Sequence, residues 1–154
     1  MSGIIAGMVL LLNKKARTEY SIEQTYTCGI VLIGSEVKSL RNKSGSLSGS
    51  YVKLLGGEAY LLNAQITPYK FSDNRDYEPT RTRKLLLKKK ELLKLEEITA
   101  QKGNTIIPLG IHLVHNKIKV EIGVGRGLKQ FEKREKIKKR TQQRSIERIM
   151  KNRW

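Results

Sequence analysis

Cysteine, aromatic and acidic residues are scarce in this chain. The single cysteine, Cys28, excludes an internal disulfide and a cysteine cluster for zinc, and it is typical of a reducing compartment. Aromatic residues make up 6% of the chain, which is few for a protein that stacks many exposed bases. Only 14 Asp and Glu face 31 Lys and Arg, so the net charge is +17 and favours a polyanionic partner.

No apolar run is long enough to cross a bilayer. The run from Ile4 to Leu12 has nine residues, whereas a membrane helix needs about 20. Cations follow this run instead of preceding it, which argues against a signal peptide. We expect residues 1–8 to be an apolar leader, translation to begin at Met1 or Met8, and a first strand to begin near Val9. The prediction is a cytoplasmic protein without a membrane partner.

Alternation of apolar and charged residues predicts antiparallel strands. Residues 117–125 alternate aliphatic side chains with Lys117, Lys119 and Glu121. Residues 105–114 precede them, and the polar pair 115–116 predicts a hairpin turn. Pro108 within the first of these strands indicates an edge position or a bulge. A second hairpin is predicted at residues 56–57, where two glycines separate the strands 51–55 and 58–66, and further strands are expected at 20–22 and 29–33.

Helical patterns are fewer. Ser35 is expected to cap a short helix that carries Val37 and Leu40, and the leucine spacing predicts a second helix over residues 88–101. The expected fold is therefore mainly β with a few short helices, arranged as an oligonucleotide-binding-like antiparallel β-barrel over residues 9–125.

The composition changes after Gly125. Residues 126–154 carry 12 Lys and Arg against 3 Asp and Glu, a net charge of +9. Apolar residues are too sparse there to bury a face, so we expect a basic tail that is disordered in the free protein and becomes helical on a polyanion.

Residues 78–87 place cations directly before three leucines. Pro79 restricts the backbone, and the cations Arg81, Arg83 and Lys84 follow it. Guanidinium groups on a stiff segment suit bidentate contact with phosphate, which predicts RNA contacts at these three residues. The alternative is a solvated flank beside an ordinary core strand.

Patterns for catalysis are weak. His112 and His115 lie in strand-like sequence, where their spacing directs them to opposite sides. Residues 123–127 imitate part of a dinucleotide loop but lack the following helix of a βαβ unit. We expect no catalytic residue, no metal and no cofactor, and the prediction is that the protein is not an enzyme.

The motifs together resemble the small protein B family, the tmRNA-binding proteins of bacterial trans-translation. The resemblance covers about residues 12–153 with the spacing intact. The matching stretches are Asn13-Lys14-Lys15-Ala16-Arg17 with Tyr20, Glu36-Val37-Lys38-Ser39-Leu40-Arg41, Ser50-Tyr51, Ile66-Thr67-Pro68-Tyr69, Pro79 to Leu87, Lys119-Val120-Glu121-Ile122-Gly123, Lys133-Arg134-Glu135 and Ile149-Met150-Lys151-Asn152.

The resemblance implies an adaptor that is a monomer when free. It would bind the tRNA-like domain of tmRNA, replace the missing anticodon arm and enter the A site of a stalled ribosome. By motif position, it implies RNA contacts at Asn13, Lys14, Arg17, Leu86 and Lys119. It also implies a tail that binds the ribosome, at the decoding centre and in the mRNA channel, through Glu132, Lys133, Arg134, Ile149 and Met150.

The chain departs from the family pattern at three places. Thr27 stands where the family often has an acidic residue, Leu128 stands where lysine is common, and the N-terminus is apolar instead of basic. Two alternatives remain open: a generic basic RNA-binding or ribosomal β-barrel protein, and an RNA-processing enzyme.

Overall fold

The computed structural model describes the backbone of residues 7–128 and 130–151, and the side chains of residues 7–128 and 133–148. In chain order the elements are β1 (Met8–Leu12), α1 (Ala16–Glu19), β2 (Tyr20–Ile30), α2 (Gly34–Arg41), β3 (Gly45–Ser46), β4 (Tyr51–Leu55), β5 (Glu58–Leu62), β6 (Gln65–Ile66), β7 (Arg83–Leu86), α3 (Lys89–Ala100), β8 (Asn104–Val114), β9 (Lys117–Gly127) and α4 (Gln130–Lys151).

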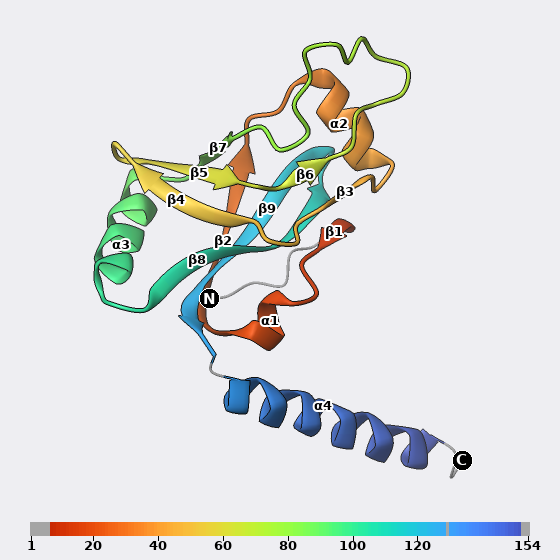
Figure 1. Cartoon of the computed structure of the whole chain (residues 1–154), viewed down its shortest axis with the longest axis vertical. Coiled ribbons are helices and arrows are strands. Elements are labelled where there is room, and N and C mark those ends of the chain that lie inside the picture. The colour runs from red at the N-terminus through yellow and green to blue at the C-terminus, as the bar shows by residue number, and fades with distance from the viewer. Residues whose placement is uncertain (1–6, 129, 152–154) are drawn as a thin grey trace.

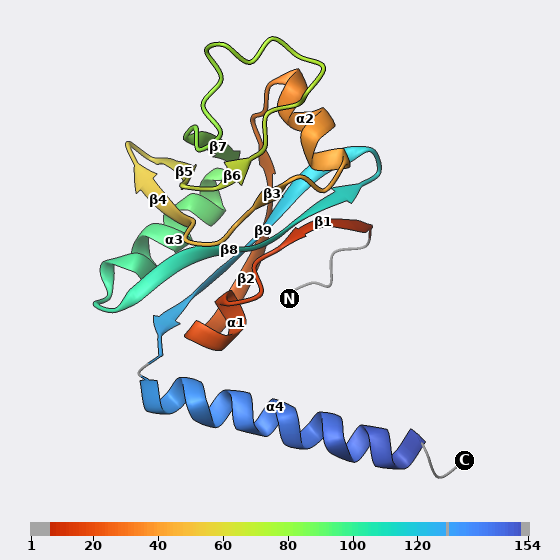
Figure 2. The same ribbon diagram turned by 45° about the vertical axis from the view of Figure 1, so that its right-hand side comes forward.

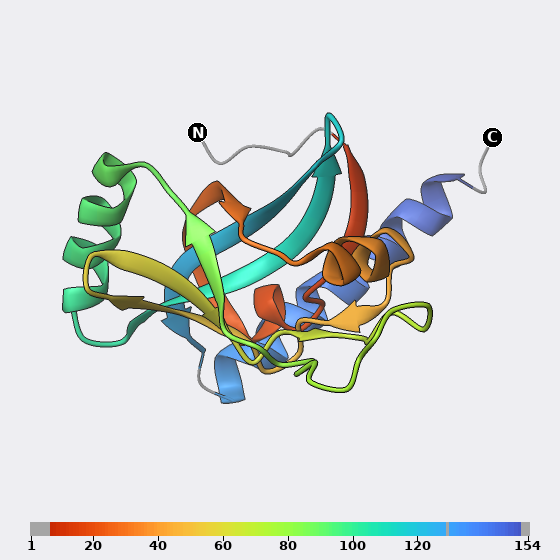
Figure 3. The ribbon, with the colours of Figure 1, turned by 90° about the horizontal axis from the view of Figure 1, so that it is seen from above.

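The main sheet is antiparallel and closes on itself. Its strand order is β1-β8-β4-β5-β7-β2-β9, and β9 also pairs with β8, so the strands from β8 to β9 form a ring. Figure 3, the view from above, shows these strands curving around a common interior, with α3 at one side. The predicted mainly β, barrel-like antiparallel fold is confirmed.

Both predicted hairpins are present. In the β4–β5 turn, Gly56 and Gly57 have φ values of 57° and 78°, which glycine adopts without strain. Residues 115–116 join β8 to β9, and the register shifts between Pro108 and Gly110. The predicted bulge at Pro108 is therefore correct, whereas the edge position is not, because β8 pairs with β1 on one side and β9 on the other.

Three further local predictions were wrong. The strand expected over residues 58–66 ends at Leu62, and residues 65–66 form β6, which pairs with β3 in a separate sheet. Residues 20–22 and 29–33 do not form separate strands, since β2 is one strand that pairs with β9 from Tyr20 to Gly29, and a bulge after Ile22 disturbs its alternation. Ser35 is not the cap of α2. The N-cap is Ile33, whose backbone N–H donates to Glu36 Oε1 at 3.0 Å.

The interior of the ring is aliphatic. Val120, Ile122 and Val124 of β9 are buried, as their alternation predicts, and Leu95 brings the predicted helix α3 into the same cluster. Lys117 on the outer face of β9 is exposed, whereas Lys119 and Glu121 are half-buried.

Helix α4 lies outside the ring. Figures 1 and 2 show it as a rod beside α1, away from the sheet. It is anchored there by Lys136 Nζ, which donates to the Tyr20 carbonyl at 3.1 Å, and by Arg140 Nη1, which donates to Thr18 Oγ1 at 3.1 Å. Among the described helices, none has the length and apolar content needed to span a bilayer.

The predicted division of the chain stays a prediction. Met8 of β1, the last residue of the expected leader, already pairs with Leu113 of β8. Strand β9 runs to Gly127, two residues past the expected end of the barrel domain at residue 125. Residues 1–6 of the expected leader lie outside the described residues. Residues 130–151 form α4 here, and disorder of the tail in the free protein is still to be tested.

Candidate nucleic-acid interface

Two of the three cations after Pro79, Arg81 and Arg83, pair with an anion inside the protein. Glu36 of α2 and Arg83 of β7 are both 0% exposed, and Arg83 Nε donates to Glu36 Oε2 at 2.7 Å. The other guanidinium nitrogens donate to the Ala64 carbonyl at 2.7 Å, the Pro79 carbonyl at 3.0 Å and the Tyr77 hydroxyl at 3.2 Å. The prediction that Arg83 contacts RNA is therefore wrong for this fold, because every nitrogen of its guanidinium is committed to an internal partner.

Arg81 completes this buried network from the edge. Its Nη2 donates to Glu36 Oε1 at 2.5 Å, and its side chain is 35% exposed. Burial alone would raise the pKa of Glu36, but the hydrogen bonds from Arg81, the Ile33 N–H and Arg83 outweigh burial and hold this pKa below its ordinary value. Lys84 is more accessible, at 43% exposure, and lies 3.6 Å from Glu58.

Leu86 and Lys119 come together although 33 positions separate them in the sequence. Gly29 of β2 pairs with Leu86 of β7 on one side and with Lys119 of β9 on the other. Leu86 is 53% exposed, which is high for a leucine in a strand. The surface around them is an open pocket, called here the Leu86–Lys119 pocket, lined by Gly29, Ile30, Leu32, Val37, Leu86, Asn116, Lys117, Ile118 and Lys119.

The first basic segment lies on another part of the surface. Asn13 is half-buried and is held in place by its backbone N–H, which donates to the Leu109 carbonyl, and by its Nδ2, which donates to the Pro108 carbonyl, both at 2.9 Å. Lys14 and Arg17 are exposed. Arg17 Nη2 lies 3.7 Å from Glu121 Oε1, so the segment reaches the charged face of β9 that also carries Lys119.

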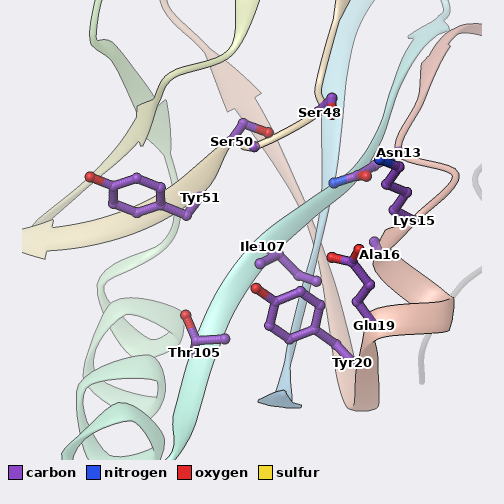
Figure 4. Close-up of a pocket in the computed structure, with 11 residues that line it drawn as sticks. Asn13, Lys15, Ala16, Glu19, Tyr20, Ser48, Ser50, Tyr51, Thr105 and Ile107 are labelled. Atoms are coloured by element: carbon purple, nitrogen blue, oxygen red, sulfur yellow. The ribbon is translucent and has the colours of Figure 1, made fainter. Parts of the chain in front are cut away.

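A second pocket adjoins this segment. Figure 4 shows Asn13, Glu19 and Tyr20 on one side and Tyr51 on the other. Its lining is mostly polar and comes from the first basic segment, α1, the first residue of β2, the loop before β4, the first residue of β4, and β8.

Glu121 lies close both to Arg17 of the first basic segment and to a buried histidine. His112 of β8 is 7% exposed, and its Nε2 lies 3.7 Å from Glu121 Oε2. Thr27, at the position where the family often has an acidic residue, is the cross-strand partner of Glu121. Within the described residues, no three His, Cys, Asp or Glu side chains gather where they could hold a metal ion.

The predicted tail residues belong to α4. Lys133 is half-buried and Arg134 is exposed. Glu132, Ile149 and Met150 are helical in their backbone, but their side chains lie outside the described residues, as does Trp154 altogether.

The sequence interpretation missed the role of Glu36. Leu40 is fully buried, and Glu36 lies one helical turn before it on the same face. A carboxylate on the buried face of a helix needs a cationic partner. Applying this rule to α2 would have directed attention to the arginines after Pro79 as that partner.

Comparison with known proteins gives a consistent result. The SmpB protein family model matches residues 10–152. An SsrA-binding protein of Lactiplantibacillus plantarum is 47% identical over 93% of this chain and 92% of its own length, and one of Geobacillus thermodenitrificans is 44% identical over 96% and 95%. A solved structure titled "tmRNA-SmpB: a journey to the center of the bacterial ribosome" is similar with a TM-score of 0.66 and 43% identity, covering 78% of this chain and 85% of that one. The chain belongs to the SmpB protein family.

Proposed function

We propose that this protein is the tmRNA-binding adaptor of trans-translation. It binds the tRNA-like domain of tmRNA, stands in for the missing anticodon arm and carries the RNA into the A site of a stalled ribosome. It acts in the cytoplasm with the ribosome, as a monomer when free, and by binding instead of catalysis. The family membership and the SsrA-binding names of its relatives support this proposal.

The observation that carries the proposal is the Leu86–Lys119 pocket. A half-exposed leucine and a lysine stand on the two strands that flank Gly29, so an apolar group and a cation face the same ligand. A Cβ on Gly29 would lie 3.3 Å from the Leu86 Cβ, so the glycine leaves room for the present position of Leu86. An RNA offers both an apolar base or ribose face and a phosphate to such a pair.

Helix α4 is the proposed ribosome-binding element. It extends away from the sheet, and the tail from residue 126 carries a net charge of +9. Lys133 and Arg134 in its first two turns, with Glu132, are assigned to the decoding centre, and Ile149 and Met150 near its end are assigned to the mRNA channel. This charge suits the phosphate-lined path that the resemblance implies.

The decisive binding test compares two RNAs at two salt concentrations. Affinity for the tRNA-like domain of tmRNA and for an ordinary tRNA of similar size is measured at low and at near-physiological salt. Since a net charge of +17 attracts every RNA at low salt, only a preference that survives the higher salt counts. If both affinities fall together, the protein is a generic basic RNA-binding barrel.

Variants then locate the contact. Lys119→Ala should weaken binding of the tRNA-like domain about tenfold, on the order of 1.4 kcal/mol, without altering the melting temperature. Lys94→Ala, at an exposed position on α3, removes the same charge elsewhere and is the matched control. Equal effects of the two substitutions would mean that net charge alone matters.

Truncation after Gly127 separates the two proposed sites. The truncated protein should keep most of its affinity for the tRNA-like domain under near-physiological salt, because the Leu86–Lys119 pocket is intact. It should fail to support tagging in a reconstituted translation reaction. Tagging at the rate of the full chain would refute the assignment of the tail to the ribosome.

A further inference from the structure

An exposed aromatic pair projects from the loop after β6. Tyr69 and Phe71 meet edge to face, with ring centroids 5.5 Å apart and an interplanar angle of 68°. Phe71 is 75% exposed, the highest value among the exposed large hydrophobic side chains of the described region. A solvent-exposed aromatic ring that is supported by packing against a second ring has a face available for stacking with a flat ligand.

Two lysines flank the rings. Lys70 Nζ lies 4.9 Å from the Phe71 ring centroid, and Lys38 Nζ of α2 lies 5.6 Å from that of Tyr69. Both distances are in the range of cation–π contacts. The nearest acid along the loop, Asp73, is paired with Arg75 at 2.8 Å. The rings are thus bordered by positive charge that a phosphate would also contact.

A shallow groove lies at the foot of the rings. It is lined by the two rings and by Ser39, Asn42, Ser44, Thr67, Pro68 and Lys70, so polar residues adjoin an apolar platform. The loop is fixed there, because the Ser39 hydroxyl donates to the Thr67 carbonyl. On the far side of the rings, Asn74 Nδ2 donates to the Tyr69 carbonyl at 2.7 Å. Local hydrogen bonds therefore hold the platform at both ends.

Helix α2 lies between this groove and the Leu86–Lys119 pocket. Val37 lines the pocket, whereas Ser39 and Asn42 line the groove. Figure 3 shows α2 between this loop and the end of the β8–β9 hairpin. A strand of RNA held at Lys119 could therefore cross α2 and reach Phe71.

We propose that Phe71, supported by Tyr69, stacks an unpaired base of the bound RNA, with Lys38 and Lys70 contacting the flanking phosphates. This inference rests on the proposed function, since it takes the partner to be RNA. An apolar peptide is the less favoured occupant, because the ammonium groups of Lys38 and Lys70 border the rings and suit a ligand that carries phosphates.

Tryptophan fluorescence tests stacking directly. Trp154 is the only tryptophan, so Trp154→Phe gives a dark background into which Phe71→Trp is introduced. Leu93→Trp in the same background is the control, because Leu93 is 54% exposed on α3 among lysines but has no ring partner. Each protein is titrated with the tRNA-like domain of tmRNA and with a single-stranded RNA nonamer, while filter binding measures affinity independently.

Strong quenching of the tryptophan at position 71, and not at position 93, by either RNA is the expected result. Phe71→Ala should also lower affinity for that RNA about tenfold, whereas Phe71→Tyr should preserve it. Binding of both RNAs without quenching at position 71, or equal quenching at both positions, would overturn the inference and leave the proposed function standing. If the nonamer quenches the tryptophan at position 71 but the protein shows no preference for the tRNA-like domain, the proposed function is refuted and base stacking at Phe71 is supported.

Discussion

Removing the charge of Glu36 should destabilise the whole barrel, because it leaves the buried guanidinium of Arg83 without a counter-charge. Glu36→Gln keeps the size of the side chain and one acceptor oxygen, but Arg83 stays 0% exposed without a counter-charge. Breaking a buried ion pair by removing one partner costs about 3–5 kcal/mol. For a domain of this size, 1 kcal/mol corresponds to about 4 °C, so we expect the melting temperature to fall by about 12–20 °C.

The assay is thermal unfolding followed by circular dichroism, with Glu58→Gln as the control. Glu58 and its partner Lys84 are both 43% exposed and 3.6 Å apart, so this substitution should cost about 1 kcal/mol or less. Similar melting temperatures for the two variants would refute the reasoning, since they would mean that the buried network contributes no more than a surface pair.

The same network predicts a pH dependence. The pKa of Glu36 is lower in the folded protein than its ordinary value of about 4.5. Its contribution to stability is therefore present above about pH 4.5 and is lost as the pH falls through the lower, folded value. Wild-type protein should lose stability more steeply than Glu36→Gln over this interval. Parallel curves for the two proteins would contradict the assignment.

Three further predictions concern other parts of the molecule. Gly125→Ala should prevent stable folding, because a Cβ there would lie 1.8 Å from the Ser21 carbonyl oxygen. The control is Gly34→Ala, whose Cβ would have no atom within 4 Å, and this variant should have the melting temperature of the wild type. Burial raises the pKa of Cys28 to about 12, so its thiol should resist iodoacetamide at pH 8 in the native protein and react once denatured; rapid native labelling would argue against this. Arg140→Ala should speed hydrogen exchange in α4 and spare the barrel, and unchanged exchange would show that its contacts with α1 do not hold the helix.

The strands and hairpins could be predicted because their determinants are local. Alternation along residues 117–124 and the paired glycines at 56–57 depend on neighbours within a few positions. The error in β2 has a local cause as well. Its central residues are polar because this part of the strand lies half-exposed or exposed on the ring, and the bulge after Ile22 breaks the alternation that would have revealed continuity.

The ligands of the arginines could not be predicted in the same way. The sequence around an arginine does not show whether its partner is a phosphate or a carboxylate, and Glu36 lies 47 positions before Arg83. Only the fold, which brings α2 over the start of β7, decides between them. The resemblance did identify Leu86 and Lys119 without geometry, and the pairing of both with Gly29 supplies a physical reason for that pair.

The distribution of charge separates affinity from selectivity. The tail carries +9 of the net +17 on residues 126–154, and the remaining +8 is spread over residues 1–125. The tail therefore supplies about half of the net charge that would attract an RNA, at a higher density than the rest of the chain, and such attraction does not depend on sequence and weakens with salt. The Leu86–Lys119 pocket contributes little charge but combines an apolar side chain with a cation. Binding to such a pair depends more on the shape of the ligand and its contacts than on its charge density. Under the proposed function, selectivity in the pocket and attraction by the tail can thus be changed independently, so substitutions in the pocket should alter which RNA binds, and substitutions in the tail should alter how strongly salt affects binding.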